Sequence, residues 1–263
     1  MSQPTNAAPK STKPSLLTKD FILVVIGQII SLFGNAALRF ALPLYILDQT
    51  GSEALFGIVS ALSFLPMVIL SPIGGIIADR VNKQRIMVIL DFFTAALVMS
   101  FLLLNGIVAI TPLVVIVLML LYGIQGAYTP SVQASLPILA PGESLVTANA
   151  VVNMVSSLSG LLGPVIGGIL YSTYGLVPIL VVSSACFAFS AIMELFIKIP
   201  HSPQPKTGNM FSIVKSDMSV SLRYIFREQP VFAKVIGLIF FFNLFLSSML
   251  IIGTPLSSPA RWV

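Results

Sequence analysis

Polar side chains that recur at helical spacing inside long apolar runs are the residues best placed to do chemistry in this sequence. Gln28, Ser31, Asn35 and Arg39 follow one another at steps of three and four residues, so a helix would carry them on one face. A charge within an apolar helix is costly unless it faces a polar cavity or reaches water. The stripe favours a polar cavity lined by Arg39. The alternative is that its long side chain extends to water at the nearer end of the helix.

Two later apolar runs repeat this spacing. Their polar residues are Tyr122, Gln125 and Thr129 in one run and Asn149, Asn153 and Ser156 in the next. Three polar stripes in one helical bundle predict a shared cavity, because polar groups facing lipid would be left without partners. The candidate cavity residues are Gln28, Asn35, Arg39, Tyr122, Gln125, Asn149 and Asn153.

Two acids also lie within apolar runs. Asp91 follows Arg85 by six residues, close enough to a basic turn to favour a structural or gating ion pair over proton carriage. Glu194 precedes Lys198 by four residues, and this spacing predicts a pair along one helix. We assign Glu194 no part in transport.

Several function classes are disfavoured by what the sequence holds. The one cysteine, Cys186, and the one histidine, His201, provide neither a disulfide nor a metal-ligand cluster. The sequence shows no Ser-His, metal-ligand or paired-carboxylate constellation of the kind that would indicate an enzyme. We also expect no cofactor. The net charge of +5 comes from basic residues that flank apolar runs, which indicates membrane anchoring and not nucleic-acid binding.

The elements that position these residues are membrane-spanning helices. Hydrophobic residues make up 56% of the chain and charged residues 9%, against about a quarter charged in soluble proteins. A hydrocarbon core of about 30 Å takes roughly 20 residues of helix to cross. Seven apolar segments are long enough: Phe21 to Leu47, Leu55 to Ala78, Ile86 to Leu104, Pro112 to Ala134, Val146 to Tyr171, Leu176 to Ile197 and Val231 to Ile252.

These segments predict an all-α integral membrane protein. Its expected parts are a disordered tail at 1–18, a six-helix bundle at 19–199, a linker at 200–230, a seventh spanning helix at 231–252 and an irregular tail at 253–263. The linker carries apolar residues at steps of three and four with basic residues on other faces, which predicts an amphipathic helix at the membrane surface. Its apolar face comprises Phe211, Val214, Met218, Leu222, Ile225 and Phe226.

Basic residues predict the orientation of the bundle. They lie before the first span, between the second and third, and after the sixth, whereas the loops 48–54, 105–111 and 172–175 contain no Lys or Arg. By the positive-inside rule the N-terminus is cytoplasmic. We therefore expect a multi-pass protein of the cell membrane.

The turn between the second and third spans carries a dense group of charges. Gly75, Asp79, Arg80 and Lys83 form a pattern that resembles the signature found at this place in the major facilitator superfamily of transporters, with Arg85 supplying one more cation. Asn82 stands where the family has a second glycine, and asparagine leaves a left-handed turn open. The resemblance implies that this turn, together with Asp91, gates the cytoplasmic side. The alternative is a polar turn whose cations only mark that side.

The fifth span contains a second motif. Gly160, Gly163, Pro164, Gly167 and Gly168 are similar to the fifth-helix signature of drug exporters in that superfamily. Helix packing alone is the alternative, since small residues let membrane helices approach closely. The sequence segment from Gln125 to Pro130 is similar to the corresponding segment in the branch that contains macrolide and siderophore exporters.

The resemblance implies a fold and a function. The fold is a six-helix N-terminal bundle of major facilitator type plus a seventh spanning helix, and the function is efflux of a hydrophobic or amphipathic small molecule from a bacterial cytoplasm by alternating access. Its partners would be the lipid bilayer, the amphipathic substrate, protons as coupling ion, and either a missing C-terminal half or a second copy of the chain. Tyr122 stands where such exporters carry an arginine, so the proton-coupling role of that arginine is not carried over. The rival reading is a truncated, non-transporting remnant or a membrane assembly partner.

Overall fold

The computed structural model describes residues 18–200 and 210–256, without the side chains of 210–213, 244 and 247–256. Most of the predicted N-terminal tail, His201 and residues 257–263 lie outside that description. The chain divides into two compact units, 1–205 and 206–263. The described residues are almost entirely helical, and their only β-type pairing is one isolated bridge between Asn105 and Val108.

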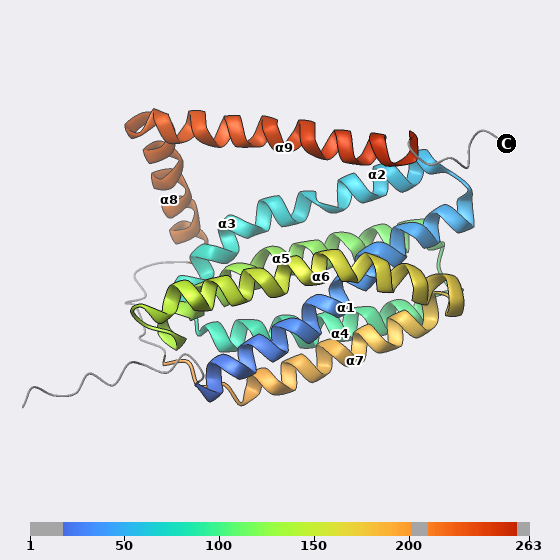
Figure 1. Ribbon diagram of the computed structural model, residues 1–263, viewed down its shortest axis with the longest axis horizontal. Helices are drawn as coiled ribbons and strands as arrows, with labels where there is room; N and C mark the ends of the chain where they lie inside the picture. The colour runs from blue at the N-terminus through green and yellow to red at the C-terminus, as the bar shows by residue number, and fades with distance from the viewer. Residues whose placement is uncertain (1–17, 201–209, 257–263) are drawn as a thin grey trace, which may run out of the picture. The chain divides into compact units, whose positions relative to one another are not determined.

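Six segments of the first unit are long and apolar enough to cross a membrane (Figure 1). They are α1 (Lys19–Thr50), α2 (Glu53–Ser63) with α3 (Leu65–Arg80), α4 (Lys83–Leu104), α5 (Ile110–Leu139), α6 (Ser144–Tyr174) and α7 (Leu176–Leu195). The all-α membrane bundle expected from the sequence is therefore confirmed.

The second span is interrupted, although the sequence predicts one helix from Leu55 to Ala78. Helix α2 ends at Ser63, Phe64 forms the break, and α3 begins at Leu65 with Pro66 in its first turn. Proline has no N–H to donate to the preceding turn and is tolerated at the start of a helix, so a new helix begins there. The break places the Phe64 ring at the junction of two helices.

Short polar turns join the helices. Gly51 adopts φ +64°, and its N–H donates to the Leu47 carbonyl at 2.7 Å, which closes the end of α1. Asn82 does not use the left-handed conformation that the sequence leaves open. Its φ is −61°, and its side chain accepts a hydrogen bond from the Arg85 N–H at 3.3 Å. Asparagine therefore serves here as the N-cap of α4.

Helix α1 runs through the middle of the bundle and packs against α5, α6 and α7, while α3 packs against α5 and α4 against α7. Serine hydroxyls of α7 donate across helices to backbone carbonyls: Ser183 to Gly34 at 3.2 Å, Ser190 to Gly27 at 3.1 Å, and Ser184 to Ala95 at 3.0 Å. Without water in the bilayer core, such bonds give buried hydroxyls the partners they need.

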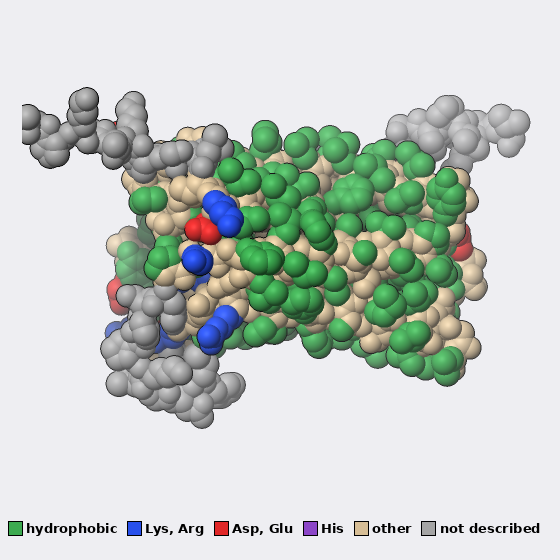
Figure 2. All heavy atoms as spheres, turned by 90° about the horizontal axis from the view of Figure 1, so that it is seen from below, with side chains coloured by type: hydrophobic (Ala, Val, Ile, Leu, Met, Phe, Trp, Pro, Cys, Tyr) green, Lys and Arg blue, Asp and Glu red, His purple; other side chains and the backbone are tan. Residues whose placement is uncertain are grey.

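One end of the first unit carries its described Lys residues and all but one of its Arg residues, and we call it the basic end. Helices α1 and α4 begin there and α3 and α7 end there, so the turns bring together Lys19, Arg80, Lys83, Arg85 and Lys198. Figure 2 shows blue side chains gathered at one end of the face in view and green hydrophobic side chains along the rest. This distribution is typical of a protein that crosses a membrane.

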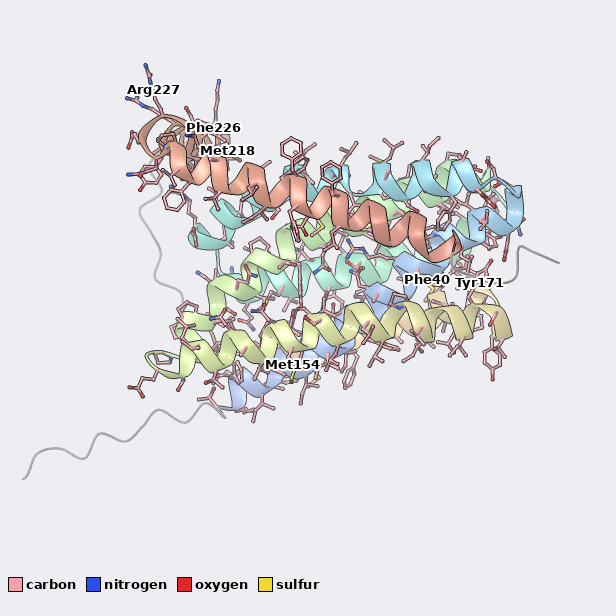
Figure 3. The ribbon with its side chains drawn as sticks, turned by 45° about the horizontal axis from the view of Figure 1, so that its top comes forward. Phe40, Met154, Tyr171, Met218, Phe226 and Arg227 are labelled. Atoms are coloured by element: carbon pink, nitrogen blue, oxygen red, sulfur yellow. The ribbon has the colours of Figure 1, made fainter. Side chains whose placement is uncertain are left out.

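The second unit consists of α8 (Met210–Arg223), a π-helical turn (Tyr224–Glu228) and α9 (Pro230–Leu256). In α8 and the π-helical turn, Val214, Met218 and Ile225 are half-buried and the basic residues are exposed; Figure 3 shows Arg227 pointing outward. Phe211 of the predicted apolar face belongs to the undescribed side chains.

Helix α9 continues to Leu256, past the predicted boundary at Ile252. The prediction of an irregular tail from residue 253 is therefore wrong for its first turn. At 27 residues, α9 is long enough for a seventh span.

Candidate functional site

A chain of side-chain hydrogen bonds links the polar stripes of α1 and α5. Asn35 donates from Nδ2 to Gln125 Oε1 at 3.0 Å, and Gln125 donates from Nε2 to Thr129 Oγ1 at 2.9 Å. Asn35 and Gln125 are buried. Each amide thus satisfies part of the other's hydrogen-bonding capacity inside the apolar bundle.

A small polar pocket lies beside this chain, where α1, α5 and α6 meet. Its volume is about 40 Å³, which is room for a few water molecules. Its polar lining comprises Gln28, Gln125, Thr129, Gln133, Asn153 and Ser156. The structure therefore brings members of all three predicted stripes to one place.

Asn149 and Ser31 belong to the predicted stripes but do not line this pocket. Asn149 donates to the Leu145 carbonyl of its own helix at 2.9 Å. Ser31 donates to Asp91 at 3.1 Å, on the side of α1 that faces α4. A stripe of four residues spans enough of the helix surface to serve two neighbours.

Arg39 lies over an aromatic ring. Its guanidinium carbon is 3.4 Å from the centroid of the Tyr122 ring, and the Phe64 ring packs on Tyr122 with 4.3 Å between centroids. Nη2 makes one weak hydrogen bond to the sulfur of Met67 at 3.8 Å, and the buried Nε has no hydrogen-bond partner among the described residues. A cation on an aromatic face is attracted by the ring quadrupole. The guanidinium is thus held within the bundle, against Tyr122.

Tyr122 stands where the resemblance to exporters implies an arginine. In this structure the cation comes from α1 and lies over the Tyr122 ring. The break at Phe64 contributes a second ring to the same cluster. We call Arg39, Phe64, Met67 and Tyr122 the Arg39 cluster.

The structure contradicts the ion pairs predicted for the two intramembrane acids, Asp91 with the basic turn and Glu194 with Lys198. Asp91 is 3% exposed and accepts from Ser31, with no Lys or Arg partner among the described residues. Glu194 is 2% exposed and accepts a hydrogen bond from the Tyr128 hydroxyl at 2.6 Å. Its predicted pair with Lys198 does not form, because α7 ends at Leu195 and Lys198 lies beyond the last turn. Both carboxyl groups point into the bundle.

Tyr128 and Ser190 were missed by the sequence reasoning. Tyr128 stands three residues after Gln125 and is 3% exposed, and Ser190 stands one turn before Glu194. A search for polar residues one turn from each intramembrane acid would have found Ser190. No local spacing connects Tyr128 of α5 with Glu194 of α7.

Within α3, ahead of its turn to α4, the close contact is made by Gly74, a glycine outside the family pattern. A Cβ at Gly74 would lie 2.6 Å from Ala127 Cα, whereas a Cβ at Gly75 would lie 4.0 Å from its nearest neighbour, in Pro130. Asp79 is exposed and makes no hydrogen bond or ion pair with other described residues. Gln84 donates from Nε2 to the carbonyls of Glu194 and Leu195, at 3.0 Å each. This glutamine ties the start of α4 to the end of α7.

The glycines of α6 pack against α1. A Cβ at Gly163 would collide with Ala36, one at Gly167 would lie 3.1 Å from Ala37 Cα, and one at Gly168 would lie 3.1 Å from the Phe40 ring. Gly160 has open space around it, and α6 continues through Pro164. Close helix packing is thus one role of this motif.

Comparison with known proteins identifies the family of this chain. The sequence model of the Major Facilitator Superfamily matches residues 24–260. Macrolide efflux protein A of Streptococcus pyogenes is 26% identical over 181 residues, which are 68% of this chain and 45% of that protein. The multidrug efflux pump Tap of Mycolicibacterium fortuitum is 24% identical over 78% of this chain and 51% of its own length.

A third relative has a different printed function. The lysophospholipid transporter LplT of Serratia proteamaculans is 30% identical over 71% of this chain and 45% of its own length. The chain thus spans about half the length of these curated relatives. With its six spans and the match over most of its length, the chain belongs to the Major Facilitator Superfamily, a family of multi-pass membrane transporters and not of enzymes.

Proposed function

We propose that this chain forms one half of an alternating-access exporter of amphipathic small molecules, with the Arg39 cluster in its substrate site. The observation that supports this most directly is a cation held on an aromatic ring inside an apolar bundle, whose buried Nε lacks a hydrogen-bond partner among the residues that the structure describes. An uncompensated cation at such depth is costly and is typically retained for a ligand. The cluster combines one cationic group with two aromatic rings.

The first unit also carries an apolar hollow, which shares no lining residue with the Arg39 cluster. It has a volume of about 280 Å³ and lies between α1 and α6. Its lining includes Ile29, Phe33 and Leu162 as well as Met154, which Figure 3 shows on α6 beside α1. Small-molecule sites combine apolar walls with a few polar groups that fix orientation. Macrolides and lysophospholipids, named for two of the relatives, both join apolar bodies to polar groups.

The orientation that we propose places the basic end in the cytoplasm, which makes the N-terminus cytoplasmic. The described loops at the opposite end contain no Lys or Arg. The bias of basic residues in short loops is the usual determinant of topology.

The turn at the basic end is the proposed gate. Asp79 sits in the last turn of α3, where the negative end of the helix dipole opposes its charge, and it is exposed. A second helix end approaching from the other half of the transporter would supply the missing compensation. Asp79 would then stabilise the state that is closed to the cytoplasm.

Transport by a joined protein tests the proposal. The chain, ending with α9 as its seventh span, is fused to the part of macrolide efflux protein A that follows the seventh span of that protein. The fusion is expressed in macrolide-sensitive bacteria, and accumulation of a fluorescent macrolide is followed. We expect the joined protein to lower accumulation and the chain alone to leave it unchanged, because alternating access needs two bundles around one site. Arg39→Gln should abolish export, while the exposed Arg223→Gln should not.

Two results would contradict parts of the proposal. Energy-dependent export by the 263-residue chain alone would overturn the half-transporter and favour a homodimer. Normal export by a correctly inserted Arg39→Gln protein would remove the Arg39 cluster from the substrate site.

A further inference from the structure

Two buried carboxyl groups of the bundle are each only half satisfied. Asp91 accepts from the Ser31 hydroxyl through Oδ1 at 3.1 Å, and Glu194 accepts from the Tyr128 hydroxyl through Oε1 at 2.6 Å. Asp91 Oδ2 and Glu194 Oε2 are buried and have no hydrogen-bond partner among the described residues. Buried polar atoms are almost always paired, so two orphaned oxygens call for an explanation.

The two carboxyl groups belong to one site. Ser190 links them, because its Oγ, which donates to the Gly27 carbonyl, also lies close to Asp91. A Cβ at Gly27 would be 3.3 Å from that Oγ and 3.8 Å from Glu194 Cγ. Tyr128 is near both acids. The site therefore draws on α1, α4, α5 and α7, next to the basic end.

No described cation compensates these acids. On α1 the facing residues, Gly27, Gln28 and Ser31, are not ionisable, and Tyr128 is the ionisable group from α5. Helix α6 contains no charged residue, and the charged residues of α3, Asp79 and Arg80, stand in its last turn at the basic end. The nearest basic residues by sequence lie in the end turns: Arg80, Lys83, Arg85 and Lys198. Two carboxylates cannot both stay charged in an apolar interior without a compensating cation.

The packing favours a proton as that cation. A bound metal ion gathers several oxygens around it and needs space between them. Here the Ser190 hydroxyl already contacts the backbone of α1 at Gly27. A proton needs no space, and as an O–H it gives an orphaned oxygen a donor.

Gln28 connects this site with the small polar pocket between α1, α5 and α6. It lines the pocket and is 5% exposed, and its Nε2 has no hydrogen-bond partner in the described part of the chain. It also approaches the Tyr128 hydroxyl without forming a hydrogen bond through that nitrogen. An unpaired amide between a pocket and a buried tyrosine is positioned to relay hydrogen bonds from water. A hydronium ion in the pocket would give its proton to a carboxylate oxygen and remain there as water.

We propose that Asp91, Glu194 and Tyr128 form a proton-binding site that holds one exchangeable proton behind the polar pocket, with Gln28 between them. This deepens the proposed transport function by naming the coupling ion and its residues. Proton binding itself depends only on the bundle. It can therefore be tested without any transport.

Infrared spectroscopy of the purified 263-residue chain in neutral lipid tests the site. The C=O stretch of a protonated carboxyl group should be present at neutral pH and disappear at alkaline pH. Labelling aspartate or glutamate with ¹³C should shift it, which assigns the band in the unaltered protein. Asp91→Asn with Glu194→Gln should abolish the band. Asp48→Asn is the matched control, because Asp48 also accepts a tyrosine hydroxyl, from Tyr171 at 2.7 Å, but in an exposed position; it should keep the band.

Three results would overturn the proposal. One is absence of the band in the unaltered, folded protein throughout the pH range. Another is its persistence in the double variant. A third is its loss when choline is replaced by sodium at constant pH, which would make sodium the bound cation. Tyr128→Phe, in which both Glu194 oxygens lack a donor, should shift the pH at which the band disappears, and an unshifted titration would exclude Tyr128 from the site.

Discussion

Gly74→Ala gives the sharpest test of how the second and fourth spans are held together. The added Cβ would stand 2.6 Å from Ala127 Cα and 2.9 Å from the Gly126 carbonyl oxygen, and both of these are backbone atoms. Carbon atoms normally rest about 3.5–4.0 Å apart, so α3 must move away from α5 by roughly 1 Å. Overpacking of this kind costs about 1–3 kcal/mol. Alanine returns about 0.5–1 kcal/mol through helix propensity, so we expect a net loss of up to about 2.5 kcal/mol.

Gly75→Ala is the matched control one residue away. Its Cβ would have no neighbour closer than 4.0 Å, so only the propensity gain applies. Thermal unfolding of the purified chains in detergent measures the difference. At roughly 2–4 °C per kcal/mol for a protein of this size, the two variants should melt several degrees apart. If Gly74→Ala melts at or above Gly75→Ala, the glycine contact between α3 and α5 does not limit packing, and the reasoning fails.

Three further predictions concern other parts of the chain. Tyr128→Phe should destabilise the bundle by about 1–3 kcal/mol because it strips a buried carboxyl of its donor, whereas Tyr171→Phe, whose bond to Asp48 is exposed, should cost less than about 1 kcal/mol in the same melting assay. Equal losses would contradict the burial argument. For topology, Ser202→Cys in a Cys186→Ala background should resist a membrane-impermeant thiol reagent in intact cells while Thr111→Cys reacts, and the reverse pattern would refute the orientation. In the joined transporter, Asp79→Asn should reduce export at normal membrane expression, and unchanged export would leave the turn as a marker of topology.

The spans were predictable because the bilayer imposes one length and one composition on every helix that crosses it. The break at Phe64 was not. Prolines at positions 43, 72 and 164 lie inside unbroken helices, whereas the helix restarts just before Pro66. A proline's effect in a membrane helix depends on what repairs the freed backbone groups, and that is a tertiary property.

The hydrogen-bond partners of the intramembrane acids could not be predicted from the sequence for a related reason. Spacing along one helix predicts contacts within that helix, which is why Glu194 was paired with Lys198. The helix ends at Leu195, and the Lys198 N–H instead donates to Asp20 at 3.1 Å. The true partner, Tyr128, lies 66 residues away in the chain. By contrast, the residues that met across α1 and α5, Asn35 and Gln125, were each identified as cavity candidates from their own stripe.

The position of Arg39 also exposes the protein to the membrane potential. Its charge lies within α1, between the two ends of the span, and is held there by Tyr122. Moving one elementary charge through the full field is worth about 2.3 kcal/mol per 100 mV. In the proposed exporter, a rocking motion that carried Arg39 through a third of a 100 mV field would change the balance between inward- and outward-open states by about 0.8 kcal/mol, or roughly fourfold. The electrical gradient would then bias the direction in which the carrier faces, even for a substrate that bears no charge.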